Sequence, residues 1–351
     1  MIEKKHISQE DYPEKTKSFG RMADGREVFC YTLTNQNGME LTVMDYGATI
    51  VSLKVPTIHH NKIDVVLGFE KVEDYINSYD LPSAPYLGCV VGRFAGRINN
   101  GAFRLKDKEI LLTKNHGKHQ LHGGKEGFGQ KIWKMKKRTH GDFPSITFEY
   151  TSQNGEENFP GVVVVEVTYK LTEANQVIVE YKAFSTDDTI VNVTQHSYFN
   201  LEGHQQNISN QLLFVNSTKM LETNEENIPT GNFLNVAHCP FDFTEEKKCP
   251  TAIDNTFVLH EKNRIAASLY SRQNQLKMSI FTNQPGVHIY VGGNCFGQIK
   301  GKEDSDYHPL SGICFETQQY PDAPNHAHFP SAVLKKGEQY DHQTIFAFET
   351  I

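Results

Sequence analysis

Long apolar runs are missing from this chain of 351 residues. A membrane-spanning helix needs about 20 consecutive apolar residues, and the most obvious apolar run, Val162 to Val165, is far shorter. Residues 1–16 are charged and are not followed by the apolar segment of a secretory signal. We therefore expect no membrane partner, and we expect the protein to reside in the cytoplasm.

Paired cysteines are missing as well. The chain has six cysteines, and no two of them form a CxxC pair, which argues against a zinc ribbon and against a dithiol motif. In a chain of this length they are expected to be reduced thiols of a reducing compartment. They are Cys30, Cys89, Cys239, Cys249, Cys295 and Cys314.

A basic surplus is also absent, because Asp and Glu number 42 and Lys and Arg number 35, for a net charge of −7. A nucleic-acid partner would favour a basic face, so none is expected. No low-complexity stretch or linker divides the sequence, and no repeat appears at a solenoid period. We therefore expect a single domain over residues 1–351, although length alone would allow two.

What the sequence does contain is alternation of apolar and polar residues with a period of two, which predicts strands. Helical signals are few, and residues 71–79 are the best candidate. The class is predicted to be all-β, as a large sandwich or barrel. The predicted strands are 163–171 and 177–183 in one hairpin, 267–270 and 276–281 in a second hairpin, 51–55, and 287–291.

Sixteen histidines make metal binding the first chemistry to consider. His116, His119 and His122 are three residues apart, whereas helical ligand pairs such as HExxH are four apart. Asn115 and the glycines that follow His122 indicate a loop instead. We expect no metal, and the pattern leaves open whether these are plain loop histidines or include a catalytic or sugar-contacting residue.

Two glycine-rich runs, 92–97 and 123–129, could suggest phosphate binding. Neither ends in GK[ST], and no long helix follows to offer its N-terminus. Turns are the better interpretation. No GxSxG elbow is present either, and no cofactor is expected.

Polar side chains gather in the segment 191–200. If this strand is regular, Asn192, Thr194, His196 and Tyr198 share one face. Such a face is too polar for a core, so we expect either a wet concave surface or an ordinary solvated strand.

Three further residues could carry chemistry. Glu316 lies in an apolar stretch near Pro321, where burial would raise the pKa of the carboxyl towards that of a general base. An exposed or ion-paired glutamate is the alternative. By pattern alone, Asp254 and His288 favour structural roles over functional ones.

Taken together, these segments resemble the aldose 1-epimerase (galactose mutarotase) family, in the family's order and over nearly the whole chain. The matching stretches are Leu41–Ile50, Val91–Ile98, Leu121–Gly124 with Gly127, Phe128 and Trp133, Asn192–Asn200, Ile253–Leu259, Pro285–Tyr290, Gly312–Gln318 and Tyr320–Ala323. The resemblance implies a large antiparallel β supersandwich with the sugar in an open cleft. It also implies an enzyme that interconverts the α and β anomers of an aldose, without metal or cofactor.

The resemblance further implies roles for individual residues. Glu316 would be the base that takes the proton of the C1 hydroxyl, and His196 the acid that protonates the ring oxygen. Four residues would bind the sugar: His122 near the ring oxygen, Arg97 and Asp254 at hydroxyls, and His288 at a position where the family varies.

Two positions depart from the commonest family pattern. Gly96 stands where many relatives carry Asn, and Tyr320 stands where some carry Trp. These departures leave galactose, glucose and pentoses open as the preferred sugar. Two other functions also stay open, a non-catalytic sugar-binding or sensor domain and an epimerase of hexose 6-phosphates. Glu316, His196 and His122 together favour the enzyme, since a binder has no need of an acid and a base at C1.

Overall fold

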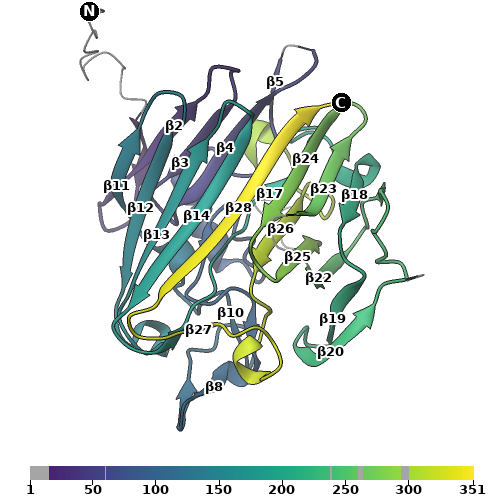
Figure 1. The fold of residues 1–351 in the computed structure, drawn as a ribbon. Coiled ribbons are helices and arrows are strands. Elements are labelled where there is room, and N and C mark those ends of the chain that lie inside the picture. The colour runs from purple at the N-terminus through teal and green to yellow at the C-terminus, as the bar shows by residue number, and fades with distance from the viewer. Residues whose placement is uncertain (1–15, 60, 238, 260–263, 294–299) are drawn as a thin grey trace, which may run out of the picture.

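The computed structural model describes residues 16–59, 61–237, 239–259, 264–293 and 300–351, and strands dominate it (Figure 1). Cys295 and residues 1–15 lie outside this description. Within these ranges, no helix has both the length and the apolar character needed to cross a membrane.

The largest sheet has nine antiparallel strands and contains both predicted hairpins. The first hairpin, predicted from 163 to 183, is β13–β14, and the second is β23–β24. The chain's last strand, β28, lies between the two hairpins and joins them in one sheet. In spatial order the strands are β11 (Lys134–Thr139), β12 (Ser145–Ser152), β13 (Val163–Leu171), β14 (Gln176–Ser185), β28 (Gln339–Thr350), β24 (Leu276–Thr282), β23 (Ile265–Ser271), β18 (Leu212–Val215) and β21 (Lys247–Lys248).

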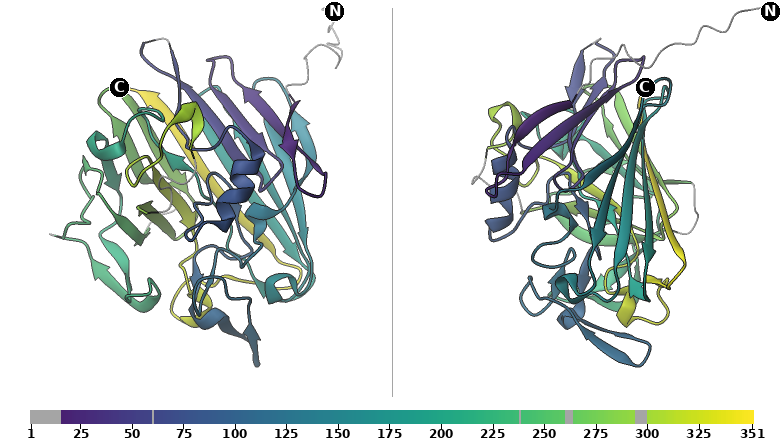
Figure 2. Two further views of the ribbon diagram at one scale, coloured as in Figure 1. Left: turned by 180° about the vertical axis from the view of Figure 1, so that it is seen from behind. Right: turned by 90° about the vertical axis from the view of Figure 1, so that its left-hand side faces the viewer.

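Two smaller antiparallel sheets pack against the nine-stranded sheet. The six-stranded sheet consists of β17 (Tyr198–Phe199), β26 (Ile313–Gln318), β25 (Gly286–Val291), β22 (Ile253–Val258), β19 (Lys219–Thr223) and β20 (Pro229–Asn235). The five-stranded sheet consists of β1 (Thr16–Arg21), β2 (Glu27–Thr34), β3 (Glu40–Met44), β4 (Thr49–Pro56) and β5 (Lys62–Asp64). Both lie on the same side of the large sheet (Figure 2, right).

Short strand pairs and helical turns complete the described chain. The pairs are β6 (Val90–Val91) with β16 (Thr194–Gln195), β7 (Arg97–Ile98) with β10 (Gln120–Leu121), β8 (Ala102–Leu105) with β9 (Lys108–Leu111), and β15 (Thr189–Ile190) with β27 (Val333–Leu334). The helix expected over 71–79 is α1 (Val72–Asn77), continued by the 3-10 turn Ser78–Asp80. Further 3-10 turns are Asn99–Gly101, Phe128–Gln130, Glu156–Asn158, Ile208–Asn210, Lys302–Asp304 and Ala323–Asn325.

One large hydrophobic core joins the three sheets. It contains Leu41 of the five-stranded sheet, Val165 and Val179 of the nine-stranded sheet, and Ile289 and Phe315 of the six-stranded sheet, all nearly fully buried. The alternation seen in the sequence is explained by this core, because every second residue of β13, β14 and β25 points into it. The predicted all-β supersandwich is therefore confirmed.

The condition set for residues 191–200, that they form one regular strand, is not met. The segment forms two short strands with different partners, since Thr194 of β16 pairs with Val91 and Tyr198 of β17 pairs with Cys314. Its polar side chains are also buried rather than wet. Asn192 donates to the carbonyls of Ala95 and Gln319, so backbone groups replace the water that the prediction assumed.

The six-stranded sheet turns its second face away from the core and towards the loops. On β25, Val287 and Ile289 point into the core, so His288 and Tyr290 point the other way. On β26, Phe315 points into the core, and Glu316 takes the opposite face. This face of β22, β25 and β26 carries the polar residues of the site.

Candidate active site

Two neighbouring cavities lie over this polar face. The smaller, of about 50 Å³, is lined by Gly96, Arg97, Leu121, His122, Asp254, His288, Tyr290, Glu316, Gln318 and Pro321. The larger, of about 340 Å³, shares Arg97, Leu121, Asp254 and Tyr290 with it and extends to Tyr86 and His116. All the predicted site residues except His196 line the smaller cavity, and His196 contacts two of those lining residues.

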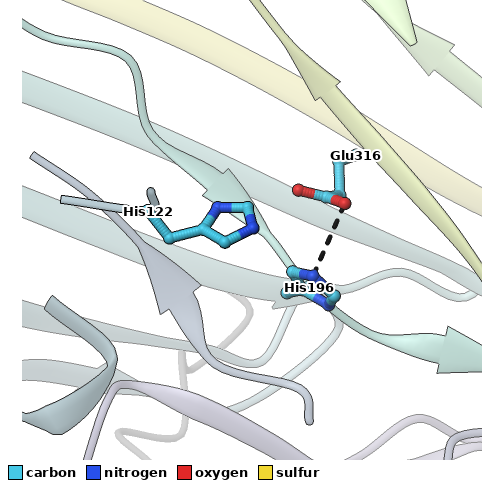
Figure 3. Close-up of side chains that lie close together, drawn as sticks. All are labelled: His122, His196 and Glu316. Carbon is cyan, nitrogen blue, oxygen red and sulfur yellow. Dashed lines mark ion pairs between the residues drawn. The ribbon is translucent and has the colours of Figure 1, made fainter. Parts of the chain in front are cut away.

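His196 and Glu316 meet at the bottom of the site. The Nε2 atom of His196 lies 3.5 Å from Oε1 of Glu316, and both side chains are buried (Figure 3). Backbone bonds fix His196 in place, because its N–H donates to the carbonyl of Cys89 and its carbonyl accepts from the N–H of Gly88. The Oε2 atom of Glu316 is buried and has no hydrogen-bond partner among the described residues. Glu316 is thus a buried carboxylate next to an imidazole and not an exposed residue.

His122 points towards the other two side chains (Figure 3). Its ring centroid lies 5.4 Å from that of His196, and its backbone has a left-handed φ of 51°. The Nδ1 atom accepts a bond from the backbone N–H of Gly96, at 3.3 Å. Burial, with a smaller contribution from the charge of His196, holds the pKa of His122 well below its usual value. His122 is therefore a neutral ring at pH 7, with its proton on Nε2.

Asp254 gathers three donors on the far side of the site. Nε2 of His288 lies 3.0 Å from Oδ1, while a guanidinium nitrogen of Arg97 lies 3.4 Å from Oδ2. Asn227 also donates to Oδ2, at 3.1 Å. Burial alone would raise the pKa of Asp254, but the hydrogen bonds and charges of His288 and Arg97 outweigh it and hold that pKa well below the usual range.

His288 receives the opposite influence. Burial lowers the pKa of His288, but the hydrogen bond and charge of Asp254 outweigh burial and raise that pKa above its usual value. The other ring nitrogen, Nδ1, lies 2.9 Å from the hydroxyl of Thr256 on β22. This arrangement leaves a charged, oriented network facing the cavity.

Comparison with known proteins identifies the family. The family model described as aldose 1-epimerase matches residues 30–347. The chain belongs to the aldose 1-epimerase family. A galactose mutarotase from Bos taurus is 36% identical over 88% of this chain and 91% of its own length, and an aldose 1-epimerase from Escherichia coli is 30% identical over 93% and 96%. The crystal structure of an aldose epimerase homologue from C. elegans superposes with a TM-score of 0.84 at 28% identity, covering 91% of this chain and 98% of its own.

Membership of the aldose 1-epimerase family confirms the fold and the family that the motifs predicted. It also confirms the predicted activity, since the chain is an isomerase that interconverts the α and β anomers of an aldose. A non-catalytic binding or sensor role and hexose 6-phosphate epimerisation are not favoured by these comparisons.

Two residues of the aldose 1-epimerase site escaped the sequence analysis. The ring of Tyr86 lies 4.8 Å from that of His122 and 5.8 Å from that of His196. Asn227, which holds Asp254, lies in the turn between β19 and β20. Both stand in irregular segments without a periodic pattern. No local signal in the sequence could have assigned them.

The departure at Gly96 has a steric reason. Its φ is +81°, and a Cβ atom there would lie 3.0 Å from the ring of Pro321. An L-residue at this position would be strained in two ways, by its backbone conformation and by this contact. Gly96 also exchanges backbone and side-chain bonds with His122, so the strain would reach the site.

The three histidines spaced three residues apart do not form a cluster. His116 is exposed, whereas His119 is buried and accepts from the backbone N–H of Asn100. His116 lines the larger cavity, and His122 is the one of the three that lines the smaller cavity, next to Glu316. His122, His196 and Glu316 have donor atoms within 4.8 Å of one another and could in principle hold a metal ion. His122 fits poorly, because the bond from Gly96 leaves its proton on Nε2, which makes that atom a donor.

Proposed function

We propose that this aldose 1-epimerase acts on a free hexose, galactose or glucose, with Glu316 as the general base and His196 as the general acid. One observation carries the assignment: a buried carboxylate and a buried imidazole lie 3.5 Å apart at a cavity. One oxygen of Glu316 is left without a partner among the described groups, which suits the C1 hydroxyl of a sugar.

The chemistry needs no more than these two groups and their placement. Glu316 removes the proton of the C1 hydroxyl while His196 gives a proton to the ring oxygen, and the bond between C1 and that oxygen breaks. The aldehyde then rotates about C1–C2. Ring closure reverses the roles, so that Glu316 returns its proton to O1 and His196 takes the proton of the ring oxygen. Each proton-transfer group contributes about 10² to 10⁴ in rate, and holding both against one bound sugar adds more.

Binding of the sugar is assigned to four residues. The Nε2 proton of His122 is available to the ring oxygen. Arg97, Asp254 and His288 offer donors and an acceptor to hydroxyl groups across the ring, and their mutual bonds hold them in place. A neutral polyol suits such a balanced set of charges.

The alternative substrate, a hexose 6-phosphate, would require a cation for the phosphate. The guanidinium of Arg93 is buried and donates to the carbonyls of Pro160 and Gly161 and to Ser152, so it is already committed. Arg97 is paired with Asp254. These commitments favour the unphosphorylated sugar, although Lys125 at the rim of the larger cavity makes the comparison worth testing.

Polarimetry tests the proposal directly. Freshly dissolved α-galactose and α-glucose, each at several concentrations, should reach the anomeric equilibrium faster with the protein than without it. Galactose 6-phosphate and glucose 6-phosphate are measured beside them. A higher kcat/KM on the phosphates would overturn the choice of substrate, and no acceleration of any sugar would overturn the function.

A cytoplasmic location is part of the same proposal. Among the described residues, Cys30, Cys89, Cys239 and Cys249 are free thiols. Free thiols are typical of a reducing compartment. Fractionation of cells followed by the mutarotation assay checks this part of the proposal.

A further inference from the structure

His196 makes a second contact that the acid–base assignment does not use. While its Nε2 atom faces Glu316, its Nδ1 atom lies 3.7 Å from the sulfur of Cys314, within hydrogen-bond distance for sulfur. Cys314 is fully buried. The two ring nitrogens of His196 thus face two side chains of one strand, β26.

The geometry of β26 accounts for this double contact. Cys314 and Glu316 are two residues apart, so their side chains leave the same face of the strand. Residues two apart on a strand are separated by roughly 7 Å, enough for one imidazole ring to fit between their side-chain ends. Phe315, between them, points into the core and anchors the strand.

Aromatic rings hold the plane of His196. The ring of Tyr198 lies 5.3 Å away at an interplanar angle of 33°, and that of Tyr86 lies 5.8 Å away at 32°. Tilted ring packing of this kind restricts the orientation of the imidazole plane, but it cannot decide which nitrogen faces Glu316. A hydrogen-bonding partner at Nδ1 can decide it.

We propose that Cys314 is a positioning residue for the reaction: its thiol holds Nδ1 of His196 so that Nε2 stays aimed at Glu316 and at the ring oxygen of the sugar. This inference rests on the proposed function, because it names the group that keeps the acid in place. Cys314 lines neither of the two cavities, so it is not placed to touch the sugar itself.

A thiol suits this position because it can both donate and accept. When His196 carries two protons, the Nδ1 proton is donated to the sulfur. When Nε2 has given up its proton to the sugar, Nδ1 keeps its own, and the sulfur still accepts it. If the resting neutral ring carries its proton on Nε2 instead, the S–H group donates to Nδ1. The ring is therefore held in every state that the reaction visits.

A neutral partner also differs from the carboxylate of a Ser-His-Asp triad. There the buried aspartate stabilises the imidazolium, which serves a histidine that must take up a proton. His196 must give its proton away to the ring oxygen. In this site the negative charge lies on the other side of the ring, on Glu316, where it works as the base.

The test compares three variants with the wild-type enzyme. Cys314→Ala removes the partner and should lower kcat about tenfold, the effect of one lost hydrogen bond, with KM changed less than twofold. Cys314→Ser restores a group that donates and accepts, so kcat should return to within about threefold of the wild-type value. Cys30→Ala is the matched control, since Cys30 is also a buried thiol of the same hydrophobic cluster, and its kcat and KM should not change.

NMR of the ring nitrogens supplies a readout that a merely structural role would not move. The ¹⁵N resonance of Nδ1 of His196 should shift in Cys314→Ala and return towards the wild-type position in Cys314→Ser. A folded Cys314→Ala variant with wild-type kcat, or an Nδ1 resonance that does not respond, would overturn the inference. If that variant does not fold, a wild-type Nδ1 resonance typical of an unbonded nitrogen overturns it instead.

The two proposals fail in different ways. If the wild-type protein does not accelerate mutarotation, the proposed function fails, while the NMR experiment still decides whether Cys314 holds His196. If the wild-type enzyme is active and the alanine variant is equally active, only the inference about Cys314 is wrong.

Discussion

His288 lies directly opposite Glu316 in the register of β25 and β26, yet its Nε2 atom turns away to Asp254, 3.0 Å from Oδ1. The ring of His288, on the middle strand β25, therefore stands between two carboxylates that come from the two flanking strands, Asp254 on β22 and Glu316 on β26. The Asp254 carboxylate is engaged by its donors, whereas one oxygen of the Glu316 carboxylate has no hydrogen-bond partner among the described residues. The same sheet face thus holds apart the carboxylate that we propose binds the sugar and the one that we propose acts as the base.

This separation predicts the effect of Asp254→Asn. The hydrogen bond and charge of Asp254 raise the pKa of His288 against the effect of burial, so without that charge the pKa should fall. A raised pKa means that the ring is charged below it and loses its charge as the pH rises through it. The NMR titration midpoint of His288 should therefore move to lower pH, and KM for the sugar should rise about 10- to 100-fold, the loss of a charged hydrogen bond.

Asn227→Ala is the matched control for that prediction. It removes a neutral donor from Asp254 and leaves the carboxylate charge in place. Its titration midpoint for His288 should stay near the wild-type value. Equal midpoints in Asp254→Asn and wild type would show that Asp254 does not set the charge of His288.

Glu316→Gln should abolish most of the acceleration. The amide has the shape of the carboxylate but cannot take the C1 proton, so the rate should fall by about 10² to 10⁴. Polarimetry at saturating sugar measures the fall, and circular dichroism checks that the fold is kept. Glu202→Gln, at a partly buried glutamate that bonds Ser271 and lines neither cavity, should keep the wild-type rate. Full activity of Glu316→Gln would show that another group is the base.

The local sequence pattern was sufficient to predict many strands of the fold but not the residues of the site. β13, β14 and β25 were predictable because each buries alternate residues in one core. That alternation can be recognised from adjacent residues of the sequence alone. The segment around His196 was not, since Thr194 and Tyr198 pair with strands about 100 residues away in opposite directions of the chain. Pairing over such distances leaves no local trace.

The site residues were predicted by resemblance to a family and not by pattern. The pattern alone favoured structural roles for Asp254 and His288, because an isolated polar residue in a strand does not indicate which side chains lie opposite it in the fold. Tyr86 and Asn227 stayed hidden for a related reason: each reaches the site from a turn whose position depends on packing elsewhere. Contacts between loops are a property of the folded molecule.

Gly96→Ala should destabilise the protein and slow the enzyme. The left-handed φ of +81° costs an L-residue about 1–2 kcal/mol, and the new Cβ would meet Pro321 at 3.0 Å. Urea denaturation measures the loss of free energy of unfolding. Gly117→Ala has a φ of +58° and nothing within 4 Å of its Cβ, so it isolates the backbone effect. The difference between the losses of unfolding free energy in the two variants measures the cost of the contact with Pro321. Equal losses would mean that Pro321 moves aside at no cost.

His342 should make stability depend on pH on the acid side. Burial lowers the pKa of His342 to about 3, and the bond of its Nδ1 to the carbonyl of Val193 offsets this only in part. The unfolded chain binds the proton near pH 6.5, so between these values the unfolded state carries one more proton than the folded state. Stability should therefore fall as the pH drops below 6.5, by about 1.4 kcal/mol per pH unit from this residue.

The variant His342→Gln separates this effect from other titrations. Glutamine keeps polar atoms for neighbours such as Thr344 but has no proton to gain, so the variant should be less stable at pH 7 and yet lose less stability between pH 7 and pH 5. The difference in free energy of unfolding between wild type and His342→Gln should be about 2 kcal/mol smaller at pH 5 than at pH 7. Exposed His59 gives the control, and His59→Gln should follow the wild-type curve. Parallel curves for His342→Gln and wild type would mean that His342 takes up its proton in the folded protein as readily as in the unfolded chain.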